Sequence, residues 1–148
     1  MIKMNVFVSF DIEHDGELYE LLLAQSRSSS SDFSVLGGSE RSTDTEVGSE
    51  RVRRRIREAD QVIVICGKHT EASTRVSAEL LIAQEEQRPY FLLWGRREIM
   101  CTKPIGAKPA EGMYSWTGQN LHDQIALTFR KSRTDAAAET VRDAARSR

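Results

Sequence analysis

One glutamate occupies an unusual place in a helix that the sequence predicts over residues 76–87. Val76, Leu80 and Ala83 recur at helical spacing and define an apolar side of this helix. Glu79 falls inside that apolar arc rather than opposite it. Burying a carboxylate is costly unless it is paired, so such a residue is either paired within the fold or kept for a chemical task. Glu79 is therefore the first candidate for a functional residue, and the alternative is a boundary glutamate that reaches solvent.

A second set of candidates follows two predicted strands, over residues 6–10 and 62–66. Both runs are apolar and rich in β-branched side chains, which is typical of parallel strands that are buried on both faces. In an open parallel sheet, ligands bind beyond the carboxyl ends of the strands, where the strand order reverses. The residues presented there are Ser9, Phe10 and Asp11 on one side and Cys66, Gly67, Lys68 and His69 on the other.

The elements that must position these residues alternate between strand and helix. Such alternation predicts βαβ units with right-handed crossovers, and hence a single α/β domain with a doubly wound, flavodoxin-like sheet. We expect four to five parallel strands in the order 2-1-3-4-5, with helices on both faces. The predicted strands are 6–10, 33–36, 62–66 and 90–94, with a short edge strand at 113–116, and the predicted helices are 16–26, an Arg-rich segment around 51–57, 76–87 and a last helix that begins after Thr117.

The chain ends in a segment rich in alanine and arginine. We expect the domain to span residues 1–131, and residues 132–148 to form a helical extension or a disordered tail without a part in catalysis.

The Arg-rich helix allows two interpretations. Arg53 and Arg57 lie at distances along the helix that permit pairing with Glu50 and Glu58, which indicates a solvated helix face. The alternative is an anion-binding patch.

Composition excludes several classes of function. The 148 residues carry a net charge of −1, which provides no global field for nucleic acid or for a membrane surface. No apolar run approaches ~20 residues, so no membrane span is expected. The two cysteines, Cys66 in an apolar strand and Cys101 in a polar loop, fit a reducing cytoplasm. Neither CxxC nor HExxH occurs, which argues against a structural metal.

Several segments, taken in order, resemble TIR and TIR-like domains, and the resemblance covers roughly residues 4 to 130. Tyr114-Ser115-Trp116-Thr117, with Asn120-Leu121, is similar to the closing motif of the bacterial and archaeal TIR-like branch. The other matching segments are the opening strand at 6–11, the second strand at 33–35 before the BB loop at 36–40, the entry to the central strand at 59–65, and the stretch 73–80.

The resemblance implies an enzyme that cleaves NAD⁺ at the bond between nicotinamide and ribose. NAD⁺ would be its substrate, with no further cofactor, and the products would be nicotinamide and ADP-ribose or a cyclised isomer. Glu79 matches the catalytic glutamate of the family, and Phe10 and Asp11 match residues on the nicotinamide side. Arg75 stands where the family has tryptophan, whereas Ser73 keeps the family serine. The candidate substrate-binding residues are thus Ser9, Phe10, Asp11, Lys68, Ser73 and Arg75.

The same branch includes the signalling subunits of Thoeris antiphage defence. By this resemblance, the chain would produce a cyclic ADP-ribose type of nucleotide messenger for a separate effector.

Two alternatives remain open. The chain could be a non-catalytic TIR-like module that self-associates or binds a partner domain or a nucleotide. It could also be a receiver-like or flavodoxin-like protein with another ligand. Against a receiver, Cys66 occupies the position at which an aspartate would end the third strand. Against a flavin site, the acidic loop 11–16 would repel phosphate.

Overall fold

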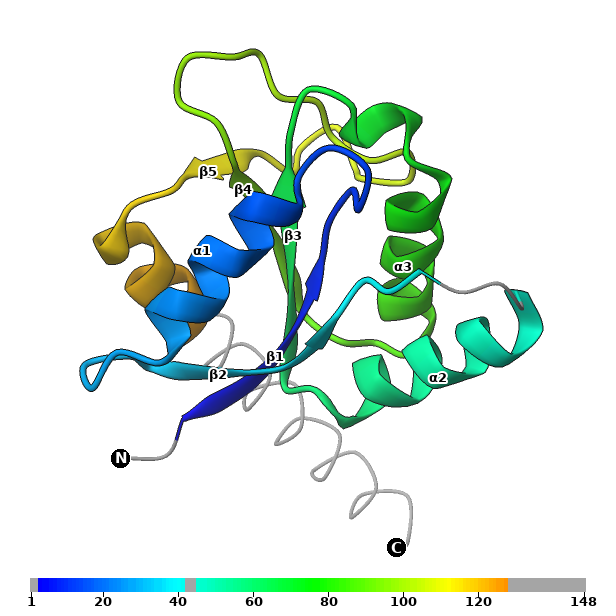
Figure 1. Cartoon of the computed structure of the whole chain (residues 1–148), viewed down its shortest axis with the longest axis horizontal. Coiled ribbons are helices and arrows are strands. Elements are labelled where there is room, and N and C mark those ends of the chain that lie inside the picture. Colours follow the sequence, from blue (N-terminus) through cyan, green and yellow to red (C-terminus); the bar gives the residue numbers. More distant parts are fainter. Residues whose placement is uncertain (1–2, 42–44, 128–148) are drawn as a thin grey trace, which may run out of the picture.

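The computed structural model describes residues 3–41 and 45–127, and it contains one five-stranded sheet (Figure 1). All neighbouring strands pair in parallel, in the order β2-β1-β3-β4-β5, which confirms the predicted topology. The central strand, β3, is buried along its whole length. The strands are β1 (Met4–Ser9), β2 (Phe33–Gly38), β3 (Gln61–Cys66), β4 (Tyr90–Trp94) and β5 (Met113–Ser115).

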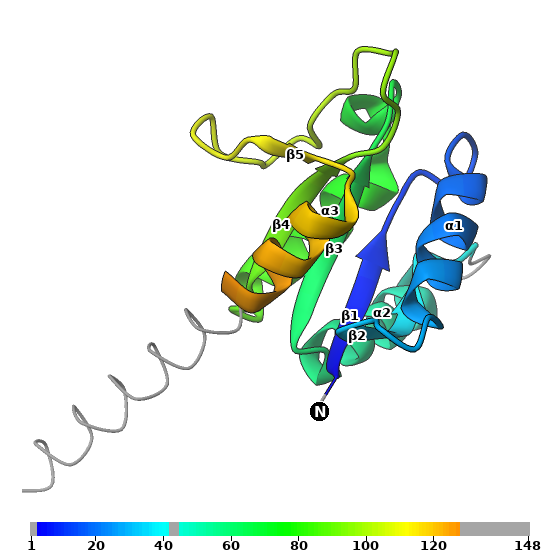
Figure 2. The same cartoon turned by 90° about the vertical axis from the view of Figure 1, so that its left-hand side faces the viewer.

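Helices cover both faces of the sheet. Figure 1 shows α1 and the helix over residues 118–127 on one side, and α2 and α3 on the other. Figure 2, turned by 90°, shows the first pair in front of the sheet. Three of these helices are α1 (Gly16–Ser26), α2 (Thr45–Glu58) and α3 (Thr74–Glu85), and a single 3₁₀ turn, η1 (Thr70–Ala72), precedes α3.

The period of two along each strand divides the apolar side chains between two cores. On β3, Ile63 and Ile65 belong to the core beneath α1 and residues 118–127, which includes Leu22 and Ile125. The alternate residues Val62 and Val64 belong to the core beneath α2 and α3. A continuous apolar run was therefore required in β3, because both of its faces are covered.

A β-bulge interrupts the pairing of β2 with β1. Val6 pairs with Val35 and Phe7 pairs with Gly37, so Leu36 is the extra residue. The strand continues through Gly38, two residues beyond the predicted end at Leu36. The predicted strand ended before the two glycines, but here both belong to the ladder.

The boundaries of the helices differ slightly from the predicted ones. α3 begins two residues earlier than predicted because Ser73 is its N-cap, accepting a hydrogen bond from Val76 N at 3.2 Å. It also ends earlier, since Gln87 has φ = 56°, in the left-handed region that ends helices. α2 begins at Thr45, well before the Arg-rich segment. The predicted extension over residues 132–148 lies outside the described residues.

Two of the arginines of α2, Arg53 and Arg57, join this helix to the end of α3. Arg53 Nη1 lies 3.0 Å from Glu86 Oε1, and Arg57 Nη2 lies 3.1 Å from the same atom. The expected partners Glu50 and Glu58 were wrong for Arg53 and Arg57, because the helix packing brings the acidic end of α3 alongside α2. The interpretation of a solvated helix face is therefore corrected for Arg53 and Arg57, which pair with Glu86 at the end of the neighbouring helix.

We expect Glu86→Gln to lower the midpoint of thermal unfolding at neutral pH. The hydrogen bonds and charges of Arg57 and Arg53 hold the pKa of Glu86 at about 2, below the ordinary value of 4.5. A lowered pKa in the folded state stabilises the fold above the ordinary value, and this contribution is lost as the pH falls towards 2. Thermal melts across this range should show the variant and the wild type converging in acid. Glu58→Gln, which removes an exposed charge from α2, is the control. A constant difference at all pH values would contradict the ion-pair explanation.

No helix in residues 3–41 and 45–127 has both the length and the apolar character needed to cross a membrane.

Candidate functional site

The side chain of Glu79 extends from α3 towards the carboxyl ends of β1 and β2 and is only 2% exposed. Its Oε1 atom accepts hydrogen bonds from Ser9 Oγ at 2.7 Å and from Ser39 Oγ at 2.5 Å. Its Oε2 atom is buried and has no hydrogen-bond partner among the described residues. The two oxygens of this carboxyl group therefore differ: Oε1 accepts two hydrogen bonds, and Oε2 accepts none from the described residues. An unpartnered buried carboxylate oxygen is costly to the fold, which is a common property of functional sites.

Burial raises the pKa of Glu79 from 4.5 to about 7. The hydroxyls of Ser39 and Ser9 and the charge of Arg75 favour the ionised form and lower this pKa, whereas Glu40 raises it. Near neutral pH, both the neutral and the charged form of Glu79 are therefore populated. A carboxyl group with this property can act as a base, or stabilise a developing positive charge.

Ser9 and Ser39 meet because β1 and β2 are neighbouring parallel strands. Ser9 is the last residue of β1, and Ser39 directly follows β2. The Ser39 amide donates to Val8 O at 3.0 Å, and Ser39 Oγ accepts from the Phe10 amide at 3.0 Å. Gly38 permits this approach, since a Cβ atom there would lie 2.8 Å from Tyr19 Cε2 and 3.1 Å from Val8 O.

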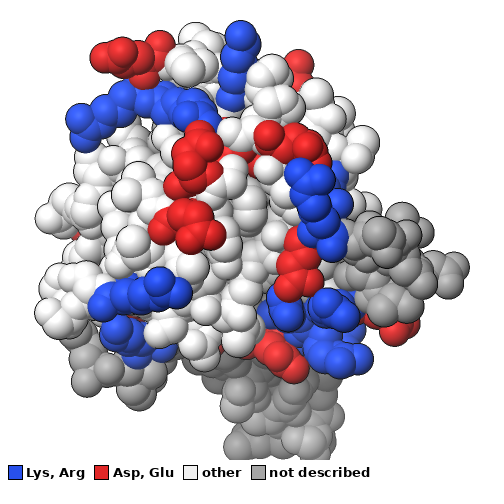
Figure 3. All heavy atoms as spheres, in the orientation of Figure 1, with Lys and Arg blue, Asp and Glu red and all other residues white. Residues whose placement is uncertain are grey.

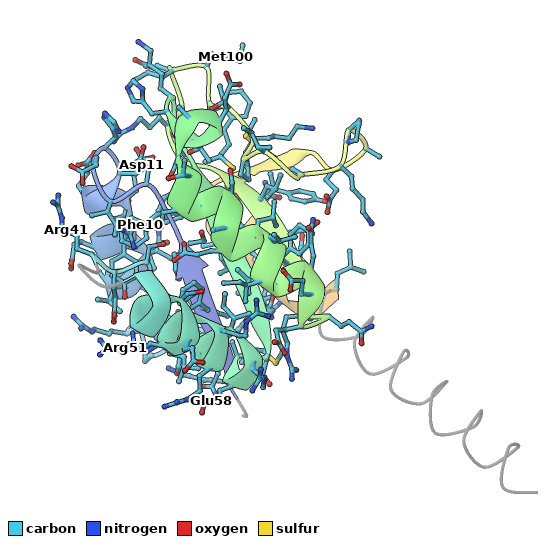
Figure 4. The ribbon with its side chains drawn as sticks, turned by 90° about the vertical axis from the view of Figure 1, so that its right-hand side faces the viewer. Phe10, Asp11, Arg41, Arg51, Glu58 and Met100 are labelled. Atoms are coloured by element: carbon cyan, nitrogen blue, oxygen red, sulfur yellow. The ribbon has the colours of Figure 1, made fainter. Side chains whose placement is uncertain are left out.

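Phe10 and Asp11 line the same end of the sheet, between α1 and α3 (Figure 4). The ring of Phe10 stacks on that of Tyr19, with centroids 4.6 Å apart. Asp11 is buried, and its carboxylate accepts a hydrogen bond from the Glu13 amide at 3.0 Å and lies 2.8 Å from His14 Nδ1. Asp11 therefore organises the turn that follows β1.

Three further candidates lie on the other side of the site. Arg75 Nη1 donates to the Glu40 carbonyl, which ties α3 to the segment after β2. Ser73 is the N-cap of α3, and Lys68 is an exposed residue of the loop after β3. The structure thus brings Ser9 and Arg75 to Glu79, places Phe10 and Asp11 at the adjoining strand end, and gives Ser73 a capping role.

Sequence reasoning missed Ser39, the closest hydrogen-bond donor to Glu79. The rule that ligands meet the carboxyl ends of strands would have selected it, had β2 been extended through Gly37 and Gly38. The signal in the sequence is a hydroxyl residue placed directly after an apolar strand and two glycines.

A second buried carboxyl group, Asp15, also escaped sequence reasoning. It is 1% exposed, burial raises its pKa, and Arg96 Nη2 lies 3.1 Å from its Oδ1 atom. Arg96 also donates to the His14 carbonyl at 2.9 Å and contacts Glu17. Arg96 thereby joins the end of β4 to the loop before α1. Nothing in the local sequence connects residues 15 and 96, which the fold alone brings together.

The described residues contain no group of three His, Cys, Asp or Glu side chains that could hold a metal ion.

The strand order and the helices on both faces define the class of protein as a doubly wound α/β domain with a parallel sheet. A family model described as "Thoeris protein ThsB, TIR-like domain" matches residues 7–96, and the chain belongs to this family. Among solved structures, the crystal structure of a prokaryotic SEFIR domain has the same fold, with a TM-score of 0.53 and 19% sequence identity. The match covers 86% of this chain and 91% of that chain. No curated protein matches the sequence.

Proposed function

We propose that this protein is an NAD⁺ nucleosidase or ADP-ribosyl cyclase that acts in antiphage signalling, with Glu79 as its catalytic residue. The observation that carries the proposal is the state of Glu79, whose buried carboxyl group keeps Oε2 without a partner. Membership of the Thoeris TIR-like family supplies the context of defence.

The chemistry follows from the carboxyl group. The bond between ribose C1′ and the nicotinamide nitrogen breaks, and its electron pair leaves with nicotinamide. The ribose then carries positive charge at C1′, which a nearby carboxylate stabilises electrostatically. Oε2 accepts a hydrogen bond from a ribose hydroxyl and so holds the sugar in place. Water at C1′ gives ADP-ribose and a proton, whereas attack by a nitrogen of the substrate's own adenine gives a cyclic isomer.

The exposed acidic side chains near the strand ends are paired with arginines, Glu13 with Arg41 at 3.2 Å and Glu17 with Arg96. Figure 3 shows acidic side chains over α1 and the loop before it, where Glu13 and Glu17 are exposed. Because Glu79 is only 2% exposed, the substrate reaches Oε2 only after neighbouring side chains move.

The test is incubation of the purified full chain with NAD⁺, with and without lysate from phage-infected cells, while free nicotinamide is measured. We expect release of nicotinamide together with an ADP-ribose product, which in the cytoplasm would act on a separate effector. Heat-inactivated protein in the same lysate is the control. Absence of nicotinamide release under every condition would overturn the proposal.

A second candidate is a non-catalytic module that binds a nucleotide or a partner, including another copy of the chain. The near-complete burial of Glu79 favours it, because a group so covered can serve the fold or an interface. Binding of NAD⁺ without release of nicotinamide would identify this function.

A further inference from the structure

Two hydroxyl groups from neighbouring strands converge on one oxygen of Glu79. Ser9 at the end of β1 and Ser39 after β2 both donate to Oε1, at 2.7 and 2.5 Å. We propose that Ser39 is a positioning residue for Glu79: together with Ser9 it engages Oε1, so that Oε2 is the oxygen presented to the substrate. This inference rests on the proposed function and deepens it.

The hydroxyl of Ser39 has little freedom to turn elsewhere. Its oxygen accepts the Phe10 amide at 3.0 Å, and its backbone amide is bonded to Val8 O. A hydroxyl group has a single proton to donate, and here Glu79 Oε1 receives it. Ser39 itself is 7% exposed, so water does not readily replace either bond. The carboxyl group is therefore held by β2 as well as by its own helix.

This arrangement determines where the acidic proton of Glu79 resides. Oε1 already accepts two O–H groups, so in the neutral form the proton lies on Oε2. A protonated Oε2 donates its own proton and is a much weaker acceptor for a ribose hydroxyl, and it does not stabilise a cation as a carboxylate does. Ionisation of Oε2 and catalytic competence therefore coincide.

The charged groups facing Glu79 are few and of opposite sign. Arg75 on α3 favours the carboxylate, and Glu40 after β2 opposes it, whereas β1 contributes the neutral Ser9. The hydrogen bond from Ser39 lowers the pKa of Glu79, so its removal raises this pKa above the present value of about 7. The range of pH in which Oε2 is charged then moves upward.

The experiment compares Ser39→Ala and Ser39→Thr with the wild type by two measurements. The first is the rate of nicotinamide release as a function of pH, and the second is an NMR titration of the ¹³C-labelled Glu79 carboxyl group. Threonine keeps the hydroxyl, whereas alanine removes it. Ser26→Ala is the matched control, because Ser26 is equally buried but donates to the Leu23 carbonyl, within α1.

We expect the pKa of Glu79 in Ser39→Ala to rise by about one pKa unit, the scale of one charge-assisted hydrogen bond. Nicotinamide release should then fall about tenfold near pH 6 and recover to within about twofold of the wild type near pH 9. Near pH 9 the KM of Ser39→Ala should match that of the wild type, because Oε2 is then ionised in both proteins and accepts the ribose hydroxyl in each. Ser39→Thr and Ser26→Ala should keep the wild-type profile.

An unchanged Glu79 titration in folded Ser39→Ala would overturn the inference, as would an equal loss of rate at every pH. If the wild type releases no nicotinamide, the proposed function fails, but the NMR titration still decides whether Ser39 controls Glu79. Should Ser39→Ala not fold, Ser39→Cys keeps a similar shape with a weaker donor, and the same upward shift is expected.

Discussion

Glu79→Gln should reduce nicotinamide release by at least about 10²-fold, the scale of one electrostatic group in an active site. The amide keeps the shape of the side chain but removes the negative charge that would stabilise the ribosyl cation. Continuous measurement of nicotinamide with saturating NAD⁺ checks this expectation. Glu85→Gln is the matched control, because it removes an exposed carboxylate from the same helix.

The stability of Glu79→Gln separates catalysis from structure. Burial raises the pKa of Glu79 from 4.5 to about 7, so ionising this group costs stability as the pH rises through that range. The cost reaches on the order of 3 kcal/mol above pH 7 and is absent below the ordinary value. The variant should therefore melt at the same or a higher temperature than the wild type at high pH.

A structural glutamate would behave in the opposite way. Its loss would lower the melting temperature, and activity would fall only in proportion to unfolding. Full turnover of NAD⁺ in a well-folded Glu79→Gln protein would exclude the catalytic mechanism and leave the interaction module as the better explanation.

Gly95→Ala should destabilise the fold by about 2 kcal/mol or more, as overpacking of a tight site does. Gly95 follows β4, and its amide donates to the Cys66 carbonyl at 2.8 Å. A Cβ atom there would lie 2.8 Å from that same carbonyl oxygen and 2.8 Å from Leu18 Cδ1. The first contact is with the backbone of the central strand, which cannot move aside without breaking the sheet.

Chemical denaturation of the full chain measures this loss as a lower midpoint. Gly118→Ala is the control, since a Cβ atom at that position meets nothing within 4 Å and the residue lies at the start of a helix. Alanine there should leave stability unchanged or raise it slightly, because it restricts the unfolded chain. Equal midpoints for the two variants would show that the end of β4 tolerates displacement.

The topology could be predicted from the sequence because each main strand is a short apolar run that can be recognised by itself. The run Val62–Cys66 is apolar at every position, and only a strand covered on both faces needs such a pattern. The position of Glu79 was equally readable, since helical periodicity placed it on the buried side and the structure leaves it 2% exposed.

The surroundings of Glu79 were not readable in the same way. Ser39 reaches it from a segment 40 residues earlier, through a strand that runs two residues beyond its predicted end. The contact between Asp15 and Arg96 spans 81 residues and depends on how two loops meet after folding. Periodicity reports which face a residue occupies but not which distant side chain it will meet there.

The bulge at Leu36 has a consequence for comparing this chain with its relatives. It divides β2 into a first part fixed by the buried Phe33 and a second part, Gly37 and Gly38, that carries Ser39 to Glu79. Leu36 is 40% exposed and pairs with no residue of β1, so the strand can gain or lose one residue here without disturbing either part. An alignment that counts residues from the start of the strand therefore misplaces Ser39 wherever an insertion or deletion falls at the bulge.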